Sequence, residues 1–149
     1  MKLAEALQER ADLNRKVQQL RVRLDLNALV QEDEKPAEDP NDLLKELNAC
    51  LSRLEQLIVM INRTNCEVKV DGMTLTQMIA RRDMLTQKIQ AYRQFISTAS
   101  ATAHRASHTE IKIHSTVNVK ELQIKADSLA KELRELDNKI QQTNWTVDI

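Results

Sequence analysis

The stretch PNDLLKELNACLSRLEQLIVMINRTN, residues 40–65, decides the fold predicted for this chain. Its large apolar residues alternate by three and four positions, the spacing of a heptad repeat, which places them along one face of an α-helix. They are Leu44, Leu47, Leu51, Leu54, Ile58 and Ile61. Asp39 and Pro40 are typical of a helix start, because Asp caps free backbone N–H groups and proline fits the first helical position. We therefore predict a long helix over 40–65 that buries this row against other helices.

Three more stretches carry the same kind of apolar row, and they predict helices over about 2–29, 76–103 and 119–142. The first row contains Ala6, Leu13, Val17, Leu20 and Leu24; the second contains Met78, Leu85, Ile89, Tyr92, Ile96, Ala99 and Ala103; the third contains Leu122, Ala126, Leu129, Leu133, Leu136 and Ile140. Thr76 is the expected cap of the middle one. Asn118, followed three residues later by Glu121, is typical of a capping box and marks the start of the last helix.

The connections between these helices have distinct compositions. Residues 31–42 contain six acidic residues, one lysine and both prolines of the chain, and we expect a solvated linker there. Residues 66–75 contain Asp71-Gly72, a pair that supplies the positive φ angles of a tight turn, between two short β-type runs. A small two-stranded hairpin is predicted, with a plain loop as the alternative.

The composition indicates an all-α protein. The 149 residues suit one domain, and one glycine and 2% aromatic residues are few for a sheet fold. We predict a single domain over 1–149, an antiparallel up-down four-helix bundle with the hairpin between its second and third helices. A flat helical sheet, or a long helical hairpin that completes its core by dimerising, is the competing arrangement.

Charge and cysteine usage exclude several classes of protein. The chain has 22 basic and 22 acidic residues, and this balance disfavours a nucleic-acid binder or a polybasic membrane binder. No segment has the roughly 20 apolar residues of a membrane span, and the charged N-terminus is unlike a signal peptide. Cys50 and Cys66 are expected to be free thiols in a reducing compartment. A cytoplasmic protein is the resulting expectation. The narrow apolar rows of the first and last helices add the expectation of a homo-oligomer.

Polar residues interrupt the apolar rows where the second and third helices meet, and they form the candidate ligand site. These residues are Asn62, Arg63, Asn65, Arg81, Arg82, Asp83 and, near the C-terminus, Trp145. Guanidinium and amide groups can form a satisfied internal network or can donate hydrogen bonds to an anion. The structural interpretation is that Arg82 and Asp83 pin the hairpin while Trp145 covers the end of the bundle. The alternative is a site for a ligand or partner.

Motifs for catalysis are absent from the sequence. His104 and His108 have the i, i+4 spacing of metal ligands and could bind a metal with Glu110, but histidines in surface loops are common. The sequence contains no Gly-rich phosphate loop, no G-x-S-x-G motif and no di-iron Glu-x-x-His pair. We expect a protein that is not an enzyme and that uses no cofactor.

An ordered set of motifs resembles one small bacterial family, the septicolysin-like proteins. The motifs are MKLAEALQERADLNRKVQQLR at 1–21, INRTN at 61–65, LT-x-x-x-ARRD-x-L at 75–85, EIKIHSTVNVKELQ at 110–123 and LDNKIQQTNWTVDI at 136–149. The resemblance runs along essentially the whole chain. It implies a helical bundle and adds the name of a cytolysin, without catalytic residues.

Three hypotheses for function follow. The first is a self-associating interaction or scaffold protein, based on the regular row of residues 40–65. The second, from the resemblance alone, is a pore-forming or membrane-active cytolysin. The third is a small-ligand or anion site at the end that carries the Asn, Arg and Trp residues.

Overall fold

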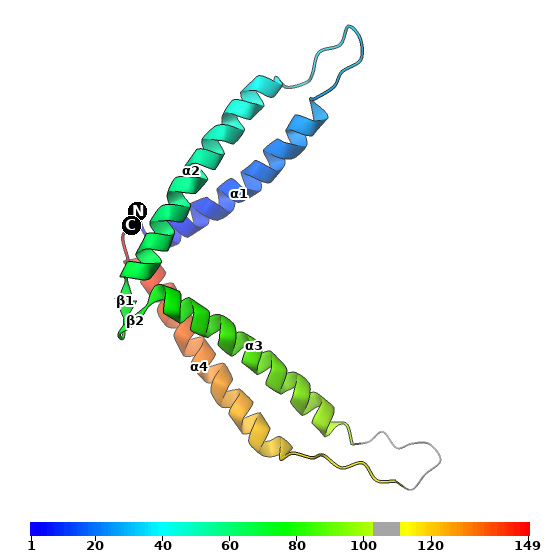
Figure 1. Cartoon of the computed structure of the whole chain (residues 1–149), viewed down its shortest axis with the longest axis vertical. Helices are drawn as coiled ribbons and strands as arrows, with labels where there is room; N and C mark the ends of the chain where they lie inside the picture. Colours follow the sequence, from blue (N-terminus) through cyan, green and yellow to red (C-terminus); the bar gives the residue numbers. More distant parts are fainter. Residues whose placement is uncertain (103–110) are drawn as a thin grey trace. The chain divides into compact units, whose positions relative to one another are not determined.

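The computed structural model describes residues 1–102 and 111–149, and in these ranges it contains four helices and one small sheet (Figure 1). The elements are α1 (Leu3–Leu26), α2 (Pro40–Glu67), β1 (Lys69–Val70), β2 (Met73–Thr74), α3 (Leu75–Ser100) and α4 (Val119–Thr146). The four predicted helices and the hairpin between the second and third are confirmed. The chain divides into two compact units, residues 1–74 with 142–149 (unit 1) and residues 75–141 (unit 2). One bundle core shared by all four helices stays a prediction.

The predicted start signals act as expected at two helices. Asp39 Oδ1 accepts a hydrogen bond from the backbone N–H of Asn41 at 2.8 Å, and Pro40 is the first residue of α2. Asn118 Oδ1 accepts one from the N–H of Glu121 at 3.2 Å, immediately before α4. The expected cap of the third helix is wrong, because α3 already begins at Leu75 and Thr76 lies inside it.

The hairpin turn has the backbone geometry that its sequence predicts. Asp71 and Gly72 have φ angles of 52° and 81°, and the antiparallel strands pair Lys69 with Thr74 and Val70 with Met73. Left-handed φ angles suit glycine best, which explains why the only glycine of the chain stands here.

In unit 1, α1 and α2 lie antiparallel and enclose an aliphatic core (Figure 1). The core consists of Val17, Leu20, Leu43, Cys50 and Leu54, with Leu13, Leu24 and Leu47 packed against it. Cys50 is therefore buried and Cys66 is exposed, and no disulfide joins these two cysteines. The row predicted for the first helix is confirmed in its central residues.

The row predicted for the second helix is confirmed at Leu54 and Ile61, and at Leu47, which packs against the core, but it is wrong by one position at its other three residues. The residues of α2 that are buried are Leu43, Cys50, Leu54, Leu57 and Ile61. Leu44, Leu51 and Ile58, which were expected in the core, are 45%, 45% and 44% exposed. Apolar residues stand side by side at 43–44, 50–51 and 57–58, so the spacing alone permits either row. Contact with α1 determines that the row with Leu43, Cys50 and Leu57 is the buried one.

In unit 2, α3 and α4 are joined by ion pairs, and the described residues of the rows predicted for them are buried or half-buried. Ala103, the last residue of the row predicted for the third helix, lies outside the described residues. The buried side chains include Leu85, Ile89 and Ile96 of α3 and Ala126, Leu129, Leu136 and Ile140 of α4. These helices confirm that heptad spacing identifies the core face where only one apolar row exists.

Candidate functional site

The polar residues at the end of α2 lie on its surface. Asn62 and Arg63 are exposed, and Asn65 is half-buried. Arg63 Nε donates a hydrogen bond to Glu67 Oε1 at 2.8 Å, one helical turn further along. This local pair, an i, i+4 contact of the kind that stabilises helix ends, gives the guanidinium a partner from its own helix.

The arginines of α3 form ion pairs that reach α4. Arg81 contacts Glu132, and Arg82 contacts Asp83 at 3.0 Å and Asp137 at 3.9 Å. Arg82 therefore faces an aspartate of α4, and the expectation that Arg82 and Asp83 pin the hairpin stays a prediction. These side chains tie two helices of unit 2 together.

Trp145 lies in the last turn of α4 and is 64% exposed. It borders a hollow of about 370 Å³ whose other lining residues come from α1: Ala4, Glu5, Gln8, Glu9 and Asp12. The three carboxylates of this lining would repel an anion. The structure thus surrounds the tryptophan with acidic residues of α1, and it does not bring the α2 residues Asn62 and Arg63 into this hollow.

Each of those carboxylates already has a partner. Glu5 Oε2 accepts a hydrogen bond from the N–H of Lys2 at 2.7 Å, and Asp12 pairs with Arg15. Glu9 accepts two hydrogen bonds from Arg53 of α2, at 2.7 and 2.8 Å. These bonds hold the pKa of Glu9 below its usual value, because they favour the charged carboxylate.

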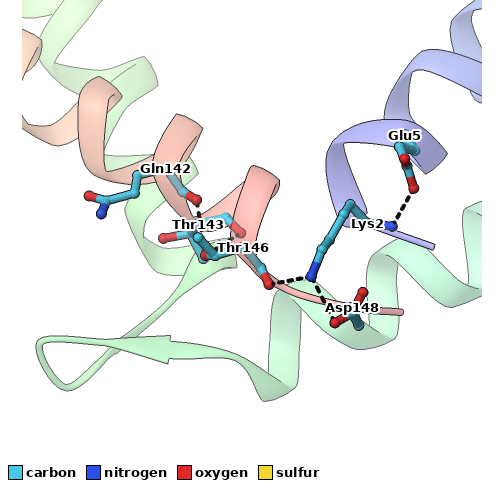
Figure 2. Close-up of polar contacts among 6 residues, drawn as sticks. All are labelled: Lys2, Glu5, Gln142, Thr143, Thr146 and Asp148. Atoms are coloured by element: carbon cyan, nitrogen blue, oxygen red, sulfur yellow. Dashed lines mark hydrogen bonds and ion pairs between the residues drawn. The ribbon is translucent and has the colours of Figure 1, made fainter.

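The two ends of the chain pair with each other, a contact that the sequence analysis missed (Figure 2). Lys2 Nζ donates to the backbone oxygen of Thr146 at 3.0 Å and to Asp148 Oδ2 at 2.8 Å. Backbone bonds from Leu3 N to Val147 O and from Ile149 N to Met1 O, both 2.9 Å, flank this pair. The bond from Lys2 lowers the pKa of Asp148. The alternation in Val147-Asp148-Ile149 was the available signal for a strand-like end.

Further ion pairs join α1 to α2 and to the segment before it. Lys16 Nζ lies 2.7 Å from Glu46 Oε1, and Arg23 Nε donates to Glu38 Oε2 at 2.9 Å. Both carboxylates have lowered pKa values because of the hydrogen bonds from these cations. Together with the pair of Glu9 and Arg53, they fix the face that α2 turns toward α1.

One flank of α2, beside the face that is buried against α1, carries an apolar line of its own. Leu44, Leu51 and Ile58 are seven residues apart and nearly half exposed, and we call them the outer row of α2. Val59, 62% exposed, widens it at one end. Exposed apolar side chains in a continuous line, unlike scattered ones, indicate an interaction surface.

The candidate metal ligands His104, His108 and Glu110 lie outside the described residues. Within residues 1–102 and 111–149, no group of three or more His, Cys, Asp or Glu side chains is placed to hold a metal ion. Over the same residues, none of the helices combines the length and the apolar character needed to cross a membrane.

These features define a small helical protein built from antiparallel helix pairs with aliphatic cores and inter-helix ion pairs. The chain belongs to a family of unknown function, DUF6847, which it matches over residues 10–149. It is also similar to a crystal structure of a functionally unknown conserved protein from Corynebacterium diphtheriae. The two share 38% sequence identity with a TM-score of 0.86, over 99% of this chain and 97% of the other. No curated protein matches the sequence.

The family corrects the resemblance drawn from the motifs. The septicolysin-like assignment is wrong, because the family match and the structural neighbour both lead to proteins of unknown function. The motifs at 61–65, 75–85 and 136–149 contain buried core residues such as Ile61, Leu75 and Ile140 and the ion-pair residues Arg81 and Arg82, and such residues identify a fold better than an activity.

Proposed function

We propose that the protein is a non-enzymatic, self-associating helical protein, and that the outer row of α2 is the contact between copies. The observation that carries this proposal is the exposure of Leu44, Leu51 and Ile58 at 45%, 45% and 44%. The core of unit 1 is complete without them, since α1 covers the neighbouring row of the same helix.

The spacing of the outer row favours a helix as the partner. Seven residues are close to two turns, or about 10 Å along the axis, so the three side chains lie in one line. Such a line matches the seam of a coiled coil, in which side chains of one helix insert between those of another. Burying it removes apolar surface from water, which stabilises the association.

The even spacing of the outer row favours a second copy of this chain as that partner. In an antiparallel pairing of two α2 helices centred on Leu51, Leu44 of one copy lies opposite Ile58 of the other. The row is therefore complementary to itself, as a twofold interface requires. The net charge of zero adds no repulsion between copies.

Sedimentation equilibrium of the full chain tests this proposal. Leu51→Glu places a charge at the centre of the interface twice, once from each copy, and should raise the dissociation constant by about 100-fold. Gln56→Glu is the matched control, because it adds the same charge to an exposed position on another face of α2 and should leave association unchanged. A wild-type chain that stays monomeric at high concentration, or equal effects of the two variants, would overturn the proposal.

A further inference from the structure

The turn between α1 and α2 exposes apolar side chains next to acidic ones. Leu26 and Leu29 are 75% and 90% exposed, and Val30 is 49% exposed. Glu32, Asp33 and Glu34 follow, all exposed, in a turn closed by a 3.0 Å bond from Glu34 N to Gln31 O. We call residues 26–34 the acidic tip. Clustered apolar side chains rimmed by charge are the composition of a docking element rather than of an ordinary solvated loop.

A hollow on unit 2 has the opposite charge. It measures about 340 Å³ and lies between α3 and α4. Its lining includes the buried Leu85 and Leu129, the cations Arg81, Lys88 and Lys125, and the carboxylate Glu132. We call it the basic groove. Its only carboxylate is held by Arg81, so the two lysines leave the groove with a positive excess.

We propose that the acidic tip of one copy docks into the basic groove of a second copy. The leucines of the tip would contact the aliphatic floor, and Glu32 and Glu34 would face Lys88 and Lys125. The charges point to this chain as its own partner, because an acidic segment with exposed leucines and a basic groove with an aliphatic floor occur in one sequence of zero net charge. This inference rests on self-association, through a surface distinct from the outer row of α2.

The contact is heterologous, since one copy gives its tip and the other its groove. Repetition of such a contact builds chains or closed rings rather than only dimers. Combined with a twofold contact through the outer row, it would produce assemblies larger than two copies. The electrostatic part is exposed and is therefore expected to weaken as salt increases.

A charge-exchange experiment tests the docking, carried out in the Leu51→Glu chain so that the outer row does not contribute. The groove variant is Lys88→Glu with Lys125→Glu, and the tip variant is Glu32→Lys with Glu34→Lys. Asp33 is left unchanged because its φ of 69° disfavours most side chains. By sedimentation velocity, each variant alone should associate about tenfold more weakly than the parent, and an equimolar mixture should recover association.

The control variant makes matched charge changes outside the groove, Arg93→Glu on α3 and Lys120→Glu on α4, and should associate like the parent. A mixture no stronger than its components would overturn the docking, as would a Leu51→Glu chain that is monomeric at every concentration. Charge effects seen within a single monomer, independent of concentration, would also overturn it. These results do not test the role of Leu51. The outer-row proposal is tested separately, by the effect of Leu51→Glu on the association of the wild-type chain.

Discussion

The two helix pairs use ion pairs differently. Between α1 and α2 they are spread along the length of the pair, from Glu9 and Arg53 to Lys16 and Glu46. Between α3 and α4 they involve the first part of α3, where Arg81 and Arg82 meet carboxylates of α4. The first pair buries an aliphatic core between its helices, and the outer row of α2 remains exposed. The second pair has its ion pairs near one end, and the basic groove lies beside them.

The largest difference in the free energy of unfolding is expected between substitutions in the core of the first pair and substitutions on its outer row. Leu20 is 0% exposed, so Leu20→Ala removes fully buried methyl groups and should cost about 2–5 kcal/mol in the free energy of unfolding. Leu44→Ala, on the outer row, should cost less than about 1 kcal/mol in the monomer. Urea unfolding monitored by circular dichroism at low protein concentration compares them. Equal losses would mean that the α1/α2 core is not organised as described.

Removing either of the two confirmed helix caps is expected to cost less stability, and it compares the two helix pairs directly. Asp39→Ala removes the cap of α2, and Asn118→Ala removes the cap of α4. Each is expected to cost about 1 kcal/mol, because one helical N–H loses its acceptor. Hydrogen exchange of the first-turn amides would locate each loss. Protection that falls in the helix whose cap is intact would contradict the assignment of the caps.

The smallest expected effect is a dependence of stability on pH, to which three carboxylates of the first pair and of the segment before α2 contribute. The folded pKa values of Glu9, Glu38 and Glu46 are lowered by hydrogen bonds from Arg53, Arg23 and Lys16. Their stabilising contribution is therefore present above the pKa of the unfolded chain and is lost as pH falls through the folded values.

Replacing Arg53 by Gln should reduce this acid-induced loss, measured by urea unfolding at a series of pH values. Arg93→Gln is the matched control on an exposed site of α3. An Arg53→Gln protein whose stability has the wild-type dependence on pH would show that the pair with Glu9 contributes nothing to it.

Much of the fold was predictable because several local signals agreed. Asp39 with Pro40, Asn118 with Glu121, and Asp71 with Gly72 each predicted the local structure that is found, since capping and turn formation depend on neighbouring residues. Heptad spacing also identified the buried faces of α1, α3 and α4. The exact row of α2 was not predictable, because the adjacent pairs Leu43 with Leu44 and Leu57 with Ile58 are equally apolar.

The candidate site was less predictable, because it depends on contacts between distant segments. Nothing in the sequence near Glu132 or Asp137 indicates that these residues meet Arg81 and Arg82. Trp145 was grouped with Asn62 and Arg63 because of its position in the chain, whereas its hollow is lined by α1. The outer row of α2 was recognised only as a core row, and its exposure is visible only once α1 is in place.

A disulfide cross-link at position 51 tests the central claim, that the outer row is a contact between copies, most directly. In a Cys66→Ser background, Leu51→Cys should form a covalent dimer on mild oxidation, because an antiparallel pairing centred there brings position 51 close to its equivalent. Gln56→Cys, exposed on another face of the same helix, should stay monomeric on a non-reducing gel. Equal cross-linking of the two variants, or none with Leu51→Cys, would contradict the claim.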